Sequence, residues 1–238
     1  GVKVTERLKK SPLPFTTSTL QQDASSKLNF APQKTMRIAQ QLYEGVNIKG
    51  QGTVGLITYL RTDSTRISVE ADAAAKEYIK EAYGAEFVGA GTVAKKDDKK
   101  VQDAHEAIRP TYMTNSPASI KDELSRDQFR LYQLIWNRFM ASRMAPAKYE
   151  NTSVKIAAGD YRFNASASKI AFDGFLSVYN INNEKSEGNV MLKSIDEDTK
   201  LTLNDLEPKQ HFTQPPAHYT EASLVKTLEE FGIGRPST

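Results

Sequence analysis

The spacing of apolar residues along the chain changes near Lys148. From Phe15 to about Ala145, apolar side chains mostly recur at intervals of three and four residues, which is typical of helices with one buried face. From Lys148 onward the period shifts towards two, which is typical of strands with one buried face. The first region is therefore predicted to be mainly helical and the second mainly β.

Capping residues predict where three of the helices lie. Proline suits the first turn of a helix, serine caps an N-terminus, and glycine commonly ends a helix. The first helix begins at Pro32 and stops at Gly45, the second covers residues 69–83 between Ser68 and Gly84, and the third follows a capping box of Ser125 and Gln128.

Turn residues divide the β region into three short strands. Residues before about Pro14 are expected to return and pair with them. From about Pro216 the spacing becomes helical again. The predicted strands are 153–156, 161–165 and 175–179, separated by turns at Gly159-Asp160 and Asp173-Gly174.

The order of these elements predicts an α+β fold in which a helical domain is inserted into a mainly antiparallel β domain. The β domain is expected to be discontinuous, because its strands lie on both sides of the helical region. The predicted domains are residues 1–14 with 147–215, residues 15–146, and the start of a further helical domain at residues 216–238.

Composition limits the classes of protein to which the chain can belong. The 238 residues are 39% apolar, which suffices for the core of one large or two modest domains. No apolar run approaches the length of a membrane-spanning helix. The net charge of +3 is smaller than is usual for proteins that coat double-stranded DNA. Without cysteine the chain has neither disulfides nor thiolate metal sites, which is compatible with the cytoplasm.

Residues 55–65 carry the strongest chemical signal, because they place a phenol two residues from a guanidinium. Leu56, Ile57 and Leu60 suggest a short buried strand before a polar turn. Side chains of an extended segment repeat every two residues, so Tyr59, Arg61 and Asp63 could face one cleft. Because the motif is so short, the alternative is that Tyr59 is a core residue and Arg61 a surface residue with no chemical role.

The longer string GLITYLRTDSTRIS closely resembles the active-site segment of type IA DNA topoisomerases. Leu60, where proline is usual in topoisomerase III, favours the bacterial topoisomerase I branch. DAHEAIRPT at residues 103–111 resembles the second signature of the family, and GIGRPST at residues 232–238 resembles its strand-binding segment. With residues 18–22 and 215–217 also fitting, the resemblance covers essentially the whole chain.

The resemblance implies a winged-helix-like tyrosine domain carried by a β arch. It also implies that the complete enzyme relaxes negatively supercoiled DNA by transient cleavage of one strand, a 5′-phosphotyrosyl intermediate and strand passage. Exchanging a phosphodiester for a phosphotyrosyl ester changes the bond free energy little, so the reaction needs no ATP. Accordingly, the sequence has no GxxxxGK[ST] phosphate loop.

Tyr59 is the expected nucleophile and Arg61 its charge partner. A free tyrosine, with a pKa of about 10, is almost wholly protonated at neutral pH and needs help. Arg61 can stabilise both the phenolate and the charge on the phosphoryl oxygens, with a planar fork that lysine lacks. Asp63 and Ser64 are candidate substrate-binding residues, although Asp63 could simply cap a turn.

The second signature contributes three candidate residues. A lone histidine is more often a structural hydrogen-bonder, but the resemblance favours His105 near the scissile phosphate or the adjacent base. Protonation there could couple DNA binding to pH, because histidine titrates near neutrality. Glu106 and Arg109 are candidate substrate contacts, or else an ion pair that orients the loop.

The end of the chain offers a third set of candidates. Arg235, Ser237 and Thr238 provide a cation, two hydroxyls and backbone N–H groups in a Gly-Pro-rich turn, which suits phosphate contacts along a single strand. The alternative is a turn between two helices. The resemblance makes contact with DNA the preferred interpretation.

The resemblance also indicates what lies outside this chain. The Toprim domain of the family, with its acidic metal-binding cluster, normally precedes this region, and nothing before Tyr59 resembles it. The chain is therefore expected to be an internal fragment that cannot cleave DNA alone. Mg²⁺ is expected in the complete enzyme, bound by that domain, and no cofactor in this chain. The expected partners are DNA, chiefly single-stranded, and the remaining domains, in the bacterial cytoplasm at the nucleoid and away from membranes.

Two other classes of protein remain as alternatives. A non-catalytic winged-helix nucleic-acid-binding module would explain the helical region but would not need Tyr59 and Arg61 together. A tyrosine recombinase would supply the nucleophile, yet its usual scattered arginines and histidine are not evident here.

Overall fold

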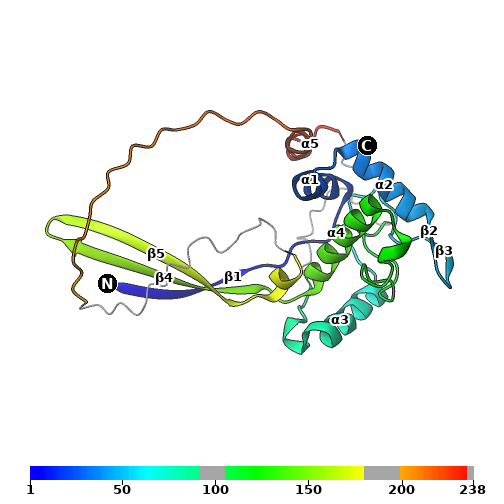
Figure 1. Ribbon diagram of the computed structural model, residues 1–238, viewed down its shortest axis with the longest axis horizontal. Coiled ribbons are helices and arrows are strands. Elements are labelled where there is room, and N and C mark those ends of the chain that lie inside the picture. The colour runs from blue at the N-terminus through cyan, green and yellow to red at the C-terminus, as the bar shows by residue number, and fades with distance from the viewer. Residues whose placement is uncertain (92–104, 180–198, 235–238) are drawn as a thin grey trace.

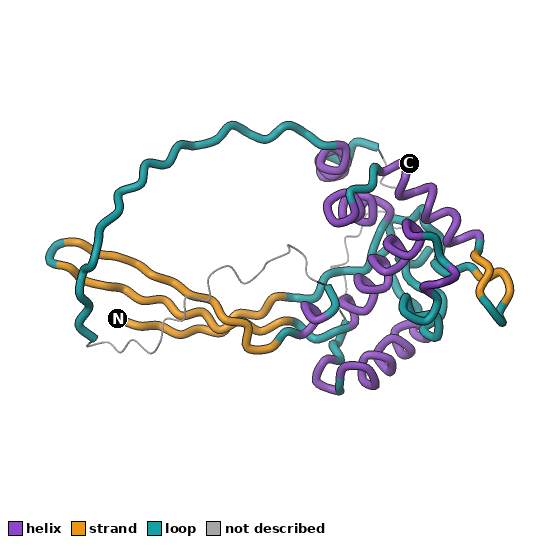
Figure 2. The backbone as a smooth tube through the Cα atoms, viewed as in Figure 1, coloured by secondary structure: helices purple, strands orange, loops and turns teal. Residues whose placement is uncertain are grey.

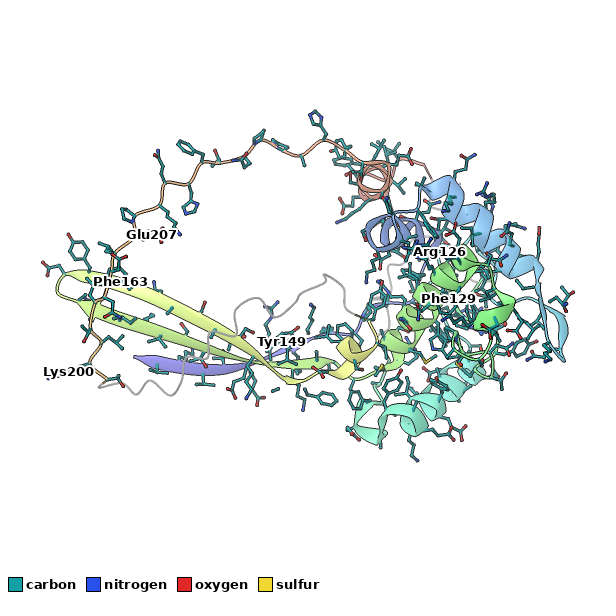
Figure 3. The ribbon with its side chains drawn as sticks, viewed as in Figure 1. Arg126, Phe129, Tyr149, Phe163, Lys200 and Glu207 are labelled. Carbon is teal, nitrogen blue, oxygen red and sulfur yellow. The ribbon has the colours of Figure 1, made fainter. Side chains whose placement is uncertain are left out.

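A long three-stranded β arm projects from a body of helices (Figure 1). The structure is a computed structural model, and it describes residues 1–91, 105–179 and 199–234. The N-terminus lies towards the free end of the arm. Figure 3 places Tyr149 on the part of the arm nearer the body and Phe163 near the free end.

The arm is an antiparallel sheet with the strand order β1-β4-β5. Its strands are β1 (Val2–Lys9), β4 (Ala147–Ala158) and β5 (Tyr161–Phe172). A turn at Gly159, with a φ of 59°, closes the hairpin of β4 and β5 as predicted. Because β1 pairs with β4, the intervening chain is inserted between two neighbouring strands. The predicted return of the N-terminal residues to the sheet is therefore confirmed.

The body is built around α4, which packs against α1, α2 and α3. Tyr132, Ile135 and Phe139 of α4 are buried, and the Tyr132 hydroxyl donates a hydrogen bond of 2.7 Å to the carbonyl of Asn115. The α-helices of the described residues are α1 (Thr17–Leu28), α2 (Pro32–Glu44), α3 (Val69–Tyr83), α4 (Arg126–Arg143) and α5 (Glu221–Glu230). A short hairpin consists of β2 (Val46–Ile48) and β3 (Gly52–Val54). The 3₁₀ turns are η1 (Ala85–Phe87), η2 (Lys121–Glu123) and η3 (Gly174–Ser177).

The predicted caps are confirmed. The hydroxyl of Ser68 accepts the N–H of Ala71, and Ser125 and Gln128 form the reciprocal capping box of α4. Such caps satisfy N–H groups that the first turn of a helix leaves without a partner. The chain turns helical again at α5, five residues later than predicted from Pro216.

Two predicted strands are wrong. Residues 175–179 form η3 and its exit, because Phe175 is fully buried against the body and does not alternate along the sheet. Residues 56–60 form no strand, only an isolated bridge between Ile57 and Pro110. The predicted strands 153–156 and 161–165 are parts of the longer β4 and β5. The run of polar residues from Asn182 to Asn189, which predicts a loop, lies outside the described residues.

A polar cluster ties the body to the chain that enters and leaves it. Arg138 donates to the carbonyl of Leu13, to Asp23 at 3.3 Å and to the Tyr179 hydroxyl at 3.2 Å. Tyr179 in turn donates to Asp23. Burial raises the pKa of Asp23, an effect that the charges of Arg138 and Lys27 partly offset. The base of the arm is thus anchored through α1 and α4.

Residues 199–220 contain no helix or strand and lead to α5 (Figure 2). Helix α5 packs against α1, where the Ser18 hydroxyl donates to the Glu229 carboxylate. The observed class is a mixed α and β fold with antiparallel sheets. The winged-helix-like form and the domain boundaries stay predictions. No helix among the described residues is both long and apolar enough to cross a membrane.

Candidate active site

The segment around Tyr59 is an extended loop whose side chains alternate between core and solvent. Leu60, Thr62 and Ser64 are buried, whereas Tyr59, Arg61 and Asp63 are exposed. The predicted two-residue alternation is therefore present, although the predicted strand is not. The buried residues anchor the backbone, and the phenol and the guanidinium are both exposed to solvent.

A second segment, which begins at His105, lies against this loop. The N–H of Thr58 donates to the carbonyl of Arg109 at 3.0 Å, and the N–H of Thr111 donates to the carbonyl of Leu56 at 3.1 Å. The Thr58 hydroxyl donates to the carbonyl of Ala107 at 2.7 Å and accepts the N–H of Arg109 at 3.0 Å. These bonds hold the residue before Tyr59 to the second segment.

Two aromatic rings flank the ring of Tyr59. The His105 ring lies 5.3 Å from it between centroids, at an interplanar angle of 41°. The Tyr43 ring, from the end of α2, lies 5.6 Å away at 66°, in an edge-to-face arrangement. Both distances lie in the range of favourable aromatic pairs. The ring of Tyr59 is therefore oriented from two sides while the side chain stays 39% exposed.

Glu106 and Arg109 form an ion pair. Arg109 Nε lies 2.7 Å from a Glu106 oxygen, and Arg109 Nη1 donates to the carbonyl of Pro110 at 3.0 Å. Their side chains are only 19% and 13% exposed. The structure therefore contains the ion pair that was predicted as the alternative to DNA contact. Contact of either residue with DNA stays a prediction.

Asp63 and Ser64 differ in their surroundings. Asp63 is exposed beside Arg61 in the sequence. Ser64 is 3% exposed, its hydroxyl accepts the N–H of Arg66 at 3.1 Å, and its own N–H donates to the Thr62 hydroxyl. Ser64 therefore shapes the turn after Arg61 in this conformation, and its contact with substrate stays a prediction. The other candidates, Arg235, Ser237 and Thr238, lie outside the described residues.

The sequence assigned no role to the start of α1, which the structure places against the loop. Thr17 makes hydrogen bonds to Leu60 and Thr62 on both sides of Arg61. Residues 18–22 fit the family resemblance without an assigned role, and the local signal is a capping box of Thr16 and Thr19 that marks the start of this helix. Contact with a loop more than forty residues away is not encoded in that signal.

The described residues do not make a metal site. Across 1–91, 105–179 and 199–234, no group of three or more His, Cys, Asp or Glu side chains could hold a metal ion. The rings of His105 and Tyr43 lie beside Tyr59. The carboxylates nearest in sequence to Tyr59 and His105 are Asp63 and the Glu106 that Arg109 already pairs. The loop therefore offers a nucleophile, a cation and an imidazole, but no carboxylate cluster.

Two comparisons with known proteins cover the whole chain. A family model described as DNA topoisomerase matches residues 1–238. The solved structure of full-length topoisomerase I from Thermotoga maritima is similar, with a TM-score of 0.78 and 42% sequence identity. That match covers 100% of this chain and 38% of the Thermotoga chain, so this chain spans well under half the length of that relative.

Proposed function

The chain belongs to the bacterial DNA topoisomerase family, and we propose that it is the part of a type IA enzyme that carries the nucleophilic tyrosine. The complete enzyme then relaxes negatively supercoiled DNA by cleaving one strand, passing another through the gap and resealing the break. The observation that carries this proposal is the exposure of both Tyr59 and Arg61, two residues apart, on a loop whose backbone is held by hydrogen bonds.

The cleavage step follows from the chemistry of a phenol. The Tyr59 phenol gives up its proton to solvent as its oxygen attacks a backbone phosphorus, a P–O bond to tyrosine forms, and the bond from phosphorus to the 3′ oxygen breaks. The 5′ phosphate stays on Tyr59, and the departing 3′ oxygen takes up a proton to become a hydroxyl. Resealing is the reverse attack, and because one phosphoester replaces another, no ATP is consumed.

Arg61 supplies charge stabilisation in this proposal. Its planar guanidinium is a cation that can donate to two phosphoryl oxygens at once. Negative charge grows on those oxygens and on the phenolate during transfer, so a fixed cation on the same side lowers the barrier. His105, whose ring lies 5.3 Å from that of Tyr59 between centroids, is proposed to donate to the same phosphate or to the adjacent base.

One face of the arm supports DNA as the partner. The strand register puts Lys3, Arg7, Lys155 and Arg162 on one face, with serine, threonine and asparagine between them and no acidic residue. Cations and small hydroxyl or amide side chains are the groups that contact phosphates and sugars. Such contacts carry no base specificity, which suits an enzyme that acts on supercoiled DNA generally.

Other domains complete the enzyme in this proposal. The described residues form no metal site, so we assign no step to Mg²⁺ here and propose that another domain binds it. The chain on its own is then inactive in cleavage and relaxation. It is proposed to bind single-stranded DNA weakly, with an affinity that falls as salt rises. The cytoplasm is the proposed location.

The test is to identify the covalent product. The complete enzyme is incubated with end-labelled single-stranded DNA and magnesium, denatured and digested, and both the modified residue and the attached DNA end are mapped. A 5′ phosphate on Tyr59 is expected. A 3′ phosphate on a tyrosine would indicate recombinase-like chemistry, and tight binding without any covalent product would favour a non-catalytic winged-helix module.

A further inference from the structure

The first residue of α1 holds the backbone on both sides of Arg61. The Thr17 hydroxyl donates to the Leu60 carbonyl at 2.7 Å and accepts the Thr62 N–H at 2.9 Å. The Thr17 N–H donates to the Thr62 carbonyl at 2.9 Å. The Leu60 carbonyl and the Thr62 N–H belong to the two peptide groups that flank Arg61, so one side chain restrains both.

These contacts are buried and rigidly supported. Thr17 is 2% exposed, and its partners Leu60 and Thr62 are buried as well. The Thr16–Thr19 capping box fixes the start of α1, while buried Leu20 anchors the helix in the core. A buried hydroxyl between two peptide groups cannot be replaced by water without rearrangement, because its space is enclosed.

Restraining both peptide groups fixes the direction of the Arg61 side chain. The backbone dihedrals of Arg61 rotate about bonds that join these two peptide planes. With both planes held by Thr17 on the buried side, the direction of the Arg61 Cα–Cβ bond is fixed, and the side chain is exposed, as that of Tyr59 is. The interaction of a cation with a growing negative charge depends on their separation, so a small rotation here weakens stabilisation of the transition state.

We propose that Thr17 is a positioning residue for DNA cleavage, acting through Arg61. The inference rests on the proposed function of Tyr59 and Arg61. Thr17 does not touch the phosphate; it keeps the guanidinium on the side where the phosphoryl group is transferred. Its loss slows cleavage of bound DNA and leaves affinity for DNA nearly unchanged.

The test compares variants of the complete enzyme. Thr17→Val removes the hydroxyl at nearly constant volume, Thr17→Ala removes it without adding an apolar methyl, and Thr17→Ser keeps it. Thr35→Val is the matched control, since Thr35 is also buried but its hydroxyl donates locally, to the carbonyl of Ala31 at the start of α2. Single-turnover cleavage at saturating single-stranded DNA and equilibrium binding are measured for each.

Thr17→Val and Thr17→Ala are expected to cleave bound DNA about tenfold to a hundredfold more slowly, the scale on which a small misplacement costs rate. Thr17→Ser and Thr35→Val are expected to cleave near the wild-type rate. If Thr17→Val fails to fold, as judged by thermal melting, Thr17→Ala decides. A wild-type cleavage rate in a folded variant without the hydroxyl overturns the proposal.

A double variant separates positioning from a general structural effect. In the Arg61→Ala background, adding Thr17→Val is expected to slow cleavage no further, because the group it positions is already gone. A further loss equal to that seen in the wild-type background would show that Thr17 acts independently of Arg61. If the proposed function itself is wrong, the wild-type enzyme forms no covalent product that depends on Tyr59, an outcome distinct from either of these.

Discussion

The imidazole of His105 packs against the ring of Tyr59, with 5.3 Å between the two ring centroids. The contact brings together two segments that are separated by more than forty residues in the sequence, and backbone bonds from Thr58 to Arg109 keep them together. His105 can therefore serve either as packing for the nucleophile or as a hydrogen-bond donor to the DNA.

His105→Phe separates these two roles, because phenylalanine keeps the ring but has no N–H group. In the complete enzyme it is expected to slow cleavage of bound DNA about tenfold, since a hydrogen bond to a charged oxygen is worth about 1.5–3 kcal/mol. The control is His211→Phe, in the extended segment before α5. Wild-type cleavage by His105→Phe would reduce His105 to a packing residue.

Arg61 should matter more to cleavage than to binding. Arg61→Ala is expected to slow cleavage about a hundredfold or more, as the loss of an electrostatic stabiliser does. Arg61→Lys should recover only part of the rate, because an ammonium has no planar fork. Arg126→Ala, at the exposed start of α4, is the control. Weaker binding in step with cleavage, at an unchanged rate on bound DNA, would make Arg61 a binding residue only.

The ion pair of Asp72 and Arg143 should make stability depend on pH. Burial alone would raise the pKa of Asp72, but hydrogen bonds from Lys76 and Arg143 outweigh it and hold the pKa below its ordinary value of 3.8. Ionised Asp72 therefore stabilises the folded state fully at pH values above 3.8. This stabilisation is lost as the pH falls through the lower pKa that Asp72 has in the folded state.

Asp72→Asn is accordingly expected to lower the free energy of unfolding by about 1–3 kcal/mol at neutral pH, the cost of lost bonds to charged groups. The difference from wild type should shrink under acid conditions. Urea denaturation of the isolated chain at several pH values measures this, with Glu70→Gln in the same helical turn as the control. A pH-independent difference would mean that the charge of Asp72 is not the cause.

Local signals located α2, α3 and α4 well, whereas α1 was not predicted. The serine caps of α3 and α4 and the proline at the start of α2 act within one turn, so a few adjacent residues suffice to locate them. The strand expected at residues 175–179 was wrong, because a short apolar run has the same appearance whether it alternates along a sheet or packs whole into a core.

The candidate site was predictable only in part. The exposed alternation of Tyr59 and Arg61 follows from their spacing, and the motif strings indicated that His105 belongs with them. The contacts that assemble the loop join residues far apart in the chain, such as Thr17 with Leu60 and Thr58 with Arg109. No periodicity specifies such pairs, because they depend on how α1 and the second segment pack in three dimensions.

The most direct test of the central claim is covalent trapping with Tyr59→Phe in the complete enzyme. Removing one hydroxyl removes the nucleophile and little surface, so single-stranded DNA should bind almost as in the wild type while no covalent protein–DNA complex forms. Tyr161→Phe, on the exposed arm, is the matched control and should trap DNA normally. Covalent complex at normal yield in Tyr59→Phe would contradict the assignment of Tyr59 as the nucleophile.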